Sequence, residues 1–158
     1  MLEMIIAEFT PVQSAVAAPV AALRLCVAVV LGAVIGIERE WRRKAAGLRT
    51  HILVSVAACL FVILGLEISA LDFGTAGEQR NDPLRMIEAV TAGVAFLAAG
   101  TIFTAKGEVK NVTTGASLWL AGAVGLGCGT GQELLAAMAT VIVVAVLALL
   151  RLVERDEG

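Results

Sequence analysis

Five charged residues stand at the edges of apolar stretches of this chain, where an ionisable side chain is rare unless it has a partner or a function. They are Arg24, Glu67, Asp82, Arg85 and Glu88. If the apolar stretches are membrane helices, these residues fall at a similar depth, and Arg85 and Glu88 share one helix face at i, i+3. We predict that they converge near the outer surface. They form either a charge-paired plug that fixes helix register or a site that responds to a cation or to protons.

The chemistry of this outer cluster argues against a dedicated metal site. Carboxylate oxygens are the ligands that Mg²⁺ prefers, but two neighbouring guanidinium groups would compete with the metal. We therefore predict no metal site and no cofactor, while a response to Mg²⁺ stays compatible with the pattern.

A second polar cluster is predicted at the inner surface of the membrane. Its members are Glu38, Arg39, Arg49, Thr113 and Thr114. Glu38 is placed to pair with Arg49 or to cap the helix that bears the threonines. The hydroxyls of Thr113 and Thr114 can bond the free N–H groups at the start of that helix, where anions are also favoured.

Basic residues crowd the segment between the first two apolar stretches, and these are Arg39, Arg42, Arg43, Lys44 and Arg49. Such a cluster is typical of a cytoplasmic loop in contact with anionic lipid. The alternative is a docking surface for a partner protein, with Trp41 as an interfacial anchor. His51 is the only histidine, so a polar cap is a better interpretation for it than a metal ligand.

The sequence contains no signature of an enzyme. GxSxG, HExxH and P-loop motifs are absent, and no Cys/His pair is expected in plausible proximity. Ser55, Ser69 and Ser117 lie on or near apolar stretches without an evident base. We predict no catalytic residue.

The elements that must position these residues are membrane-spanning helices. Apolar residues make up 59% of the 158 positions and charged residues 16%, and the mean hydropathy is +0.91, which is far more apolar than a soluble domain. About 20 apolar residues cross a bilayer, and five such stretches occur, near residues 19–37, 51–71, 84–105, 112–128 and 133–153. We predict an all-α bundle over 19–153, after an interfacial segment 1–18 and before a cytoplasmic tail 154–158.

The basic residues predict the orientation of this bundle. With the N-terminus outside and the C-terminus inside, nine Lys and Arg residues fall on the inner loops and tail, and only Arg80 and Arg85 face outward. Loops rich in Lys and Arg stay on the cytoplasmic side. The net charge of −2 gives no basic surface for nucleic acid.

Small residues predict where the helices approach one another, because backbones in lipid come close only where side chains are small. The predicted packing positions are Gly32, Gly36, Gly93, Gly100 and Gly122. Packing within one chain is the simpler interpretation, and a homodimer seam is the alternative. The fifth stretch has no polar face and is expected to be an outer helix in contact with lipid.

Five ordered motifs resemble the transmembrane domain of the MgtC/SapB family. They are Gly36–Arg39, Ala46–His51, Asp82–Arg85, Phe96–Gly100 and Thr113–Trp119. The resemblance implies a bacterial inner-membrane protein of a family associated with growth at low magnesium and survival in host cells. It also implies regulation of other membrane proteins instead of magnesium transport. The chain resembles the short, membrane-only branch, because no extended cytoplasmic domain follows.

Two functions are consistent with this pattern. The first is a non-catalytic regulator of other inner-membrane proteins in adaptation to low magnesium, acid or host stress, with the lipid bilayer and another copy of the chain as further partners. The second is a small ion or solute transporter or channel subunit, in which Glu67 and Glu88 are coupling carboxylates. The absence of charge in the middle of the spans favours the regulator, because transporter sites lie near the midplane.

Overall fold

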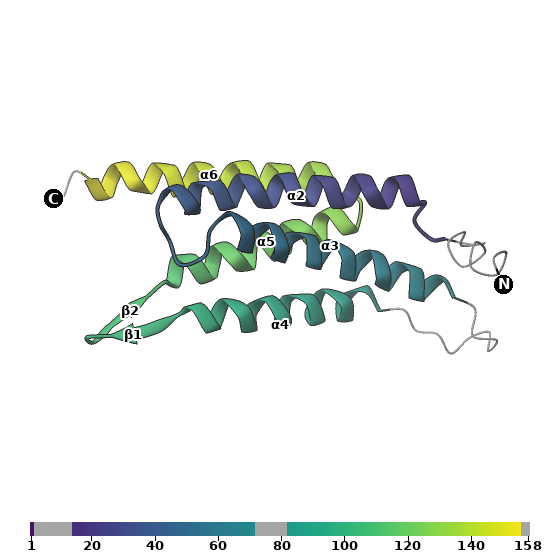
Figure 1. Ribbon diagram of the computed structural model, residues 1–158, viewed down its shortest axis with the longest axis horizontal. Coiled ribbons are helices and arrows are strands. Elements are labelled where there is room, and N and C mark those ends of the chain that lie inside the picture. Colours follow the sequence, from purple (N-terminus) through teal and green to yellow (C-terminus); the bar gives the residue numbers. More distant parts are fainter. Residues whose placement is uncertain (2–13, 72–81, 156–158) are drawn as a thin grey trace.

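The computed structural model describes Met1 and residues 14–71 and 82–155, with side chains described as far as Leu149. Most of the predicted segment 1–18, the loop 72–81 and the end of the tail lie outside these residues. The elements in order are α2 (Ala18–Trp41), α3 (Leu48–Ala70), α4 (Pro83–Thr101), β1 (Phe103–Ala105), β2 (Glu108–Lys110), α5 (Val112–Gly129) and α6 (Glu133–Arg155) (Figure 1). Each predicted apolar stretch forms a helix, so the all-α bundle is confirmed.

The helices have the length and composition of membrane spans. α2, α3, α4 and α5 are long and apolar enough to cross a bilayer, and Glu133–Leu149 of α6 adds a shorter apolar helix. Pro19 lies in the first turn of α2, where a missing N–H costs no helical hydrogen bond. Pro83 opens α4 in the same way, and the Asp82 carboxylate accepts a hydrogen bond from the Leu84 N–H at 3.0 Å. Asp82 is therefore an N-cap.

One boundary differs from the prediction. The third apolar stretch was predicted to run to Ala105, but α4 ends at Thr101 and a two-stranded hairpin follows, with Thr104 opposite Val109. Its turn consists of Lys106 and Gly107, both with positive φ (55° and 80°), as a tight two-residue hairpin turn requires. The apolar residues Ile102 and Phe103 extend the hydropathy of α4 into the hairpin and so conceal where the helix ends.

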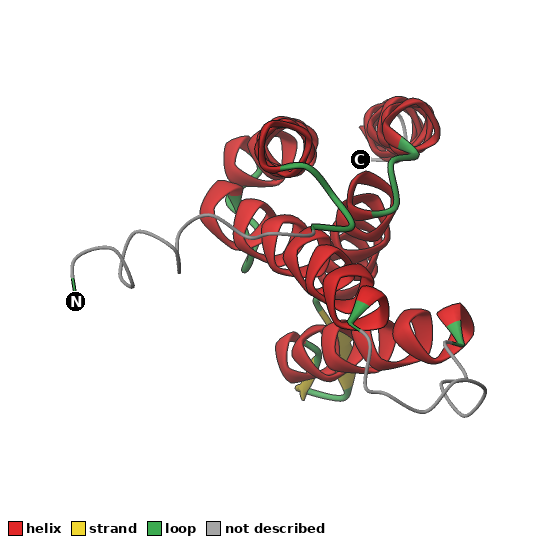
Figure 2. Ribbon diagram, turned by 90° about the vertical axis from the view of Figure 1, so that its right-hand side faces the viewer, coloured by secondary structure: helices red, strands yellow, loops and turns green. Residues whose placement is uncertain are grey.

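The bundle is centred on α3 and α5. α5 contacts each of the other four helices, α2 packs closely against α3, and α6 lies against α2 and α5. α4 is the lowest helix in both ribbon views and is attached mainly to α5 (Figures 1 and 2). The exposed apolar side chains of α6, such as Leu134, Val141 and Leu149, fit the expected outer helix.

Glycines set the distances between the central helices. A Cβ added at Gly32 would lie 2.9 Å from the His51 carbonyl oxygen, and one at Gly36 would lie 2.7 Å from the Cα of Leu48, so both glycines of α2 pack against α3. Gly122 of α5 packs in the same way against Val94 of α4. By contrast, an added Cβ at Gly93 or Gly100 of α4 would have no described atom within 4 Å. Of the predicted packing positions, Gly32, Gly36 and Gly122 thus lie at close contacts between helices of the chain.

Candidate functional site

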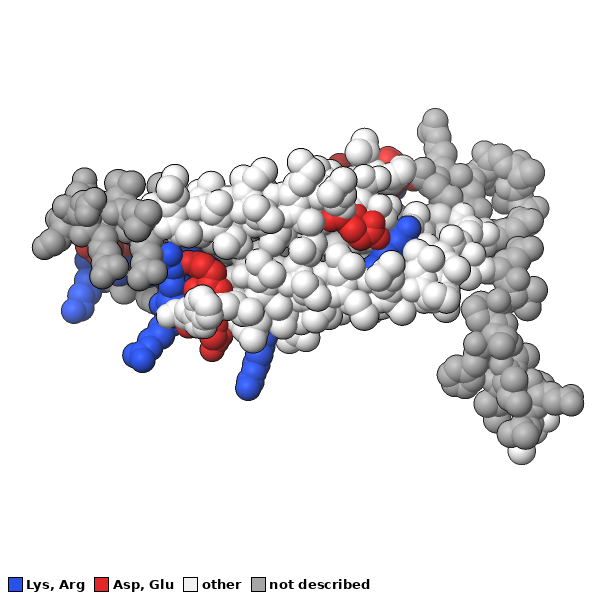
Figure 3. Space-filling view, turned by 90° about the horizontal axis from the view of Figure 1, so that it is seen from above, with Lys and Arg blue, Asp and Glu red and all other residues white. Residues whose placement is uncertain are grey.

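Polar side chains gather at the two ends of the bundle. The end at which α2 ends and the hairpin projects is called the basic end here, because it holds Arg39, Arg42, Arg43, Lys44, Arg49, Lys106 and Lys110. The end where α2 and α4 begin is called the opposite end. Figure 3 shows acidic and basic side chains together at the basic end, a smaller charged group towards the other end, and a surface without Lys, Arg, Asp or Glu between them.

A network of charges closes the basic end of α2. The Glu38 carboxylate lies between Arg39, at 3.5 Å, and Arg42, one helical turn on. The Arg42 Nη2 also donates a hydrogen bond to the Leu147 carbonyl of α6, at 3.2 Å. The Arg39 side chain is buried, and its Nε and Nη2 have no hydrogen-bond partner among the described residues. A buried guanidinium depends strongly on its one carboxylate partner.

The predicted roles of Glu38 and Arg49 are wrong in part. Glu38 pairs with the guanidinium groups of Arg39 and Arg42 on its own helix, whereas Arg49 is exposed. Glu38 does not cap α5, since its carboxylate oxygens have no hydrogen-bond partner among the described residues. A different carboxylate, that of Glu40, accepts a hydrogen bond from the Leu48 N–H at 3.0 Å at the start of α3. The i, i+4 spacing of Glu38 and Arg42 is the sequence signal for this arrangement.

A buried hydrogen-bonded chain links α3 to α5 just inside the basic end. The Nδ1 of the fully buried His51 lies 2.8 Å from the Gly47 carbonyl oxygen, and its Nε2 lies 3.0 Å from the Ser117 Oγ. That Oγ is also placed to donate to the Thr114 carbonyl oxygen at 2.9 Å. Nδ1 must carry a proton, because its partner only accepts. In a neutral ring the Ser117 hydroxyl donates to His51, and in a charged ring it donates to Thr114.

This chain of hydrogen bonds corrects two expectations. Ser117 was expected to lack a base, yet an imidazole nitrogen lies within hydrogen-bond distance of its hydroxyl. Thr113 and Thr114 were expected to offer hydroxyls to the start of α5, but Thr113 is exposed and Thr114 takes part through its backbone carbonyl. The residue before α5 is Asn111, in the left-handed conformation with φ 64°. His51 and Ser117 are 66 positions apart in the sequence, so no local pattern predicts their contact.

The opposite end does not contain the single cluster that the sequence predicted. Arg24 donates to the Gly129 carbonyl oxygen at 2.9 Å and pairs with Glu133 of α6 at 3.8 Å. The Glu67 carboxylate accepts hydrogen bonds from the Ser14 hydroxyl at 2.7 Å and from the backbone N–H groups of Ala15 and Val16. Glu67 therefore holds the segment that leads into α2.

Arg85 and Glu88 take no part in either of these groups. Both side chains are exposed on the first turns of α4, and none of the ion pairs found within the described ranges includes them. The physical reason is the helix order, because α2 lies beside α6 and α3, while α4 lies on the other side of α5. Similar depth in the membrane did not bring these charges together. Glu133 was missed, although it stands in the first turn of α6 at the depth of Arg24.

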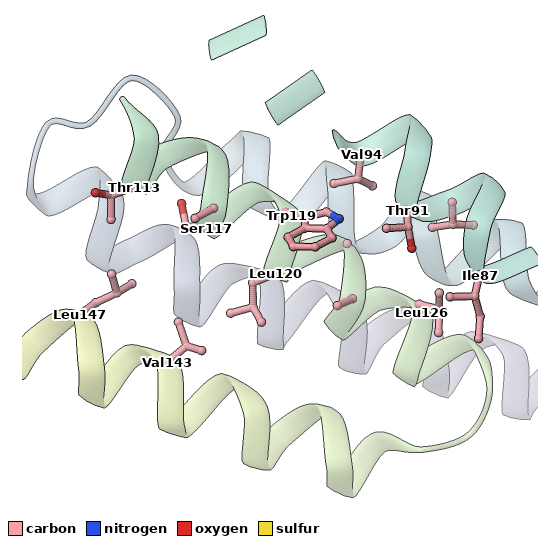
Figure 4. Close-up of a pocket in the computed structure, with 14 residues that line it drawn as sticks. Ile87, Thr91, Val94, Thr113, Ser117, Trp119, Leu120, Leu126, Val143 and Leu147 are labelled. Carbon is pink, nitrogen blue, oxygen red and sulfur yellow. The ribbon is translucent and has the colours of Figure 1, made fainter. Parts of the chain in front are cut away.

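Openings between the described helices include the following three. One of about 500 Å³ lies between α4, α5 and α6, with Thr91, Thr113 and Ser117 as its only polar lining residues (Figure 4). A second, of about 430 Å³, lies between α3 and α4 and is wholly apolar in its lining. A third, of about 640 Å³, lies between α2 and α6 at the basic end and has both apolar and charged walls.

These features define a multi-pass helical membrane protein with polar ends and an apolar middle. The chain belongs to the MgtC family, whose family model matches residues 25–156, so the resemblance of its motifs is confirmed. It is 40% identical over 135 residues to Protein MgtC of Brucella abortus, covering 84% of this chain and 53% of that protein. It is 36% identical over 129 residues to Protein MgtC of Salmonella typhimurium, covering 82% and 52%.

A cyanobacterial relative adds to this picture. An uncharacterized protein of Synechocystis is 42% identical over 109 residues, which cover 69% of this chain and 43% of that protein. The chain thus spans about half the length of the curated relatives it matches. No solved structure matches it.

Proposed function

We propose that this chain is a non-catalytic protein of the bacterial inner membrane that regulates other membrane proteins in adaptation to low magnesium, acid or host stress. The physiological setting comes from the family resemblance. The observation that supports regulation over transport is the distribution of charge along the helices. Between the two ends, none of the five helices carries an Asp, Glu, Lys, Arg or His, whereas a transporter normally binds its substrate near the midplane.

The packing of the middle of the bundle also favours a regulator over a transporter. A Cβ added at Gly125 of α5 would lie 2.0 Å from the Ser55 carbonyl oxygen of α3, so the two backbones are in direct contact. Gly32 of α2 makes a similar close approach to α3. A solute path through this region would require the closest helix contacts of the bundle to separate.

The surroundings of Ser117 favour a protein without catalysis. An acyl-transfer site needs free N–H donors for the developing oxyanion. Ser117 lies within α5, where the neighbouring N–H groups are used by the helix. His51 Nδ1 faces a backbone carbonyl oxygen instead of a carboxylate. The pair is therefore better suited to joining α3 and α5 than to reacting with a substrate.

The exposed face of α4 is the best candidate for binding a partner helix. Gly93 lines the opening between α3 and α4, an added Cβ at Gly93 or Gly100 would have no described atom within 4 Å, and Phe96 beside them is 80% exposed. In lipid, small residues allow close approach of a second helix. Because α4 is attached mainly to α5, a partner can reach this face without disturbing the central packing.

The proposal predicts contact with another protein and no transport. A photo-crosslinking amino acid at Gly93 should attach the chain to another protein of the native membrane, identified by mass spectrometry. The same group at Val141, exposed on α6, is the matched control and should give lipid adducts only. Purified protein in liposomes should show no flux of Mg²⁺ or protons. Robust uptake that Glu88→Gln abolishes would establish the transporter instead.

A further inference from the structure

We propose that the groove between α2 and α6 at the basic end binds one anionic glycerophospholipid, with its phosphate at Arg42 and Lys44. The groove is lined by Val34, Ile37, Glu38, Trp41, Arg42, Lys44, Val144 and Ala148. This assignment does not depend on which protein the chain regulates.

The walls of the groove change from apolar to charged along its length. Val34 and Ile37 of α2 face Val144 and Ala148 of α6, and the charged residues follow at the end of α2. From Val34 to Trp41 the helix rises about 10 Å, at about 1.5 Å per residue. This order matches a phospholipid, whose acyl chains lie in the hydrocarbon region while the phosphate lies at its edge. A free phosphate has no use for the apolar part.

The charge of the groove is complementary to an anion. Among the described side chains, Glu38 is the one carboxylate of the lining, and Arg39 and Arg42 both pair with it. Lys44 lies beside them, exposed, and none of the described ion pairs includes it. Counted over the described side chains of the lining, the site thus keeps an excess of positive charge after its internal pairs are formed.

The position of Arg42 distinguishes this groove from a diffuse basic surface. Its guanidinium is bound to Glu38 on one side and to the Leu147 carbonyl oxygen on the other, so it is fixed between α2 and α6. A planar guanidinium has five N–H donors and binds phosphate through two at once. Trp41 is 84% exposed at the same edge, where indole rings favour the lipid headgroup level.

Trp41 provides a direct reporter of lipid in the groove. The chain has two tryptophans, so Trp119→Phe leaves Trp41 as the single one. This variant is reconstituted in bilayers that contain brominated phosphatidylglycerol or brominated phosphatidylcholine at equal low mole fraction. Bromine quenches indole fluorescence only at short range. We expect Trp41 to be quenched several-fold more by the anionic lipid than by the zwitterionic one.

Two matched pairs of substitutions locate the binding. Lys44→Gln, within the groove, should weaken the preference for phosphatidylglycerol about fivefold, since one basic residue at an anionic surface contributes about 1 kcal/mol. Arg43→Gln removes the same charge from an exposed neighbour outside the lining and should leave the preference unchanged. Ala148→Phe should fill the groove and abolish the preference, whereas Ala145→Phe, on the exposed surface of α6, should not.

Three results would overturn the assignment. Equal quenching by the two lipids would exclude an anionic-lipid site. Equal losses in Lys44→Gln and Arg43→Gln would show a diffuse basic surface. Relief of quenching by inorganic phosphate at constant ionic strength would assign the groove to a free anion. Each variant is first checked for an unchanged thermal melting curve, and Ala145→Phe tests the effect of bulk on α6 independently of the groove.

Discussion

The bundle has two regions that differ in how closely their helices pack: the group α2, α3 and α5, and the single helix α4. In the first group, glycines bring backbones into contact, as at Gly32 and Gly125, and a buried hydrogen-bonded chain through His51 crosses the interface. α4 is attached mainly to α5, and an added Cβ at Gly93, which lines the opening between α3 and α4, or at Gly100 would have no described atom within 4 Å. The same residue type therefore serves as close packing in one region and as an unoccupied face in the other. We infer a rigid centre that carries a helix available to a partner.

The largest difference between the two regions should appear when a methyl group is added to a glycine. Gly125→Ala places a Cβ against the Ser55 carbonyl oxygen, so α3 and α5 must separate. We expect a loss of more than about 3 kcal/mol, the upper end of ordinary overpacking, measured as lost monodisperse protein and a lower melting temperature in detergent. Gly93→Ala is the control and should change the free energy of unfolding by less than about 0.5 kcal/mol. Equal effects of the two variants would remove the distinction between the regions.

The next largest effect concerns the buried charges at the basic end. Glu38→Gln leaves the buried Arg39 guanidinium without its carboxylate, and we expect a loss of about 3 kcal/mol. Adding Arg39→Met should restore part of this loss, because a missing charge costs less than an unpaired one. Thermal melting of the two single variants and the double variant gives the coupling.

The Arg24 pair at the opposite end is the control for this cycle. Arg24 and Glu133 are farther apart, at 3.8 Å, and the Glu133 side chain is 34% exposed, so their coupling should be smaller. Losses that simply add in the Glu38 and Arg39 cycle would contradict the dependence of Arg39 on Glu38.

A smaller difference in stability is expected between the losses of two buried hydroxyls of the central helices, those of Ser117 and Ser55. Ser117→Ala removes the partner of His51 Nε2 and leaves that buried nitrogen unpaired, for an expected loss of about 2 kcal/mol. Ser55→Ala removes a hydroxyl that donates to the Ala28 carbonyl oxygen at 3.0 Å. That oxygen keeps its helical hydrogen bond, so we expect about 1 kcal/mol. A larger loss in Ser55→Ala, measured by thermal melting, would show that His51 does not depend on Ser117.

The sequence predicts where each helix lies along the chain better than it predicts which helices pack together, and the reason is physical. Hydropathy, Pro83 and the capping residue Asp82 act locally, and they place α4 to within a few residues at its start. The predicted end of α4 is wrong because Ile102 is apolar and exposed, so hydropathy alone does not separate the helix from the hairpin. The position of Arg24 along its own helix is also a local property of the sequence. Which helix lies beside α2 depends on the packing of the whole bundle, and so the partner Glu133 was missed.

The small residues show the same limit. A spacing of four along α2 correctly marks Gly32 and Gly36 as a packing face, and similar small residues mark α4. The spacing does not predict that α3 covers the face of α2 that bears Gly32 and Gly36. It also does not predict that no described residue lies within 4 Å of an added Cβ at Gly93 of α4. The basic end was located by its charges, but the contact between His51 and Ser117 required the pairing of α3 with α5.

The smallest effect is expected at the start of α4, where Arg85 and Glu88 share a helix face. Exposed pairs of this kind contribute between zero and about 0.5 kcal/mol, because water already solvates both charges and fixing two long side chains costs entropy. Arg85→Gln, Glu88→Gln and the double variant should therefore all melt within about 2 °C of the parent protein, with no measurable coupling. Since this result leaves the charges of α4 free to pair with another protein, the same variants should alter crosslinking from Gly93 although they leave stability unchanged. A coupling above 1 kcal/mol would instead mean that Arg85 and Glu88 are buried in the assembled protein, and α4 would then belong with the rigid centre.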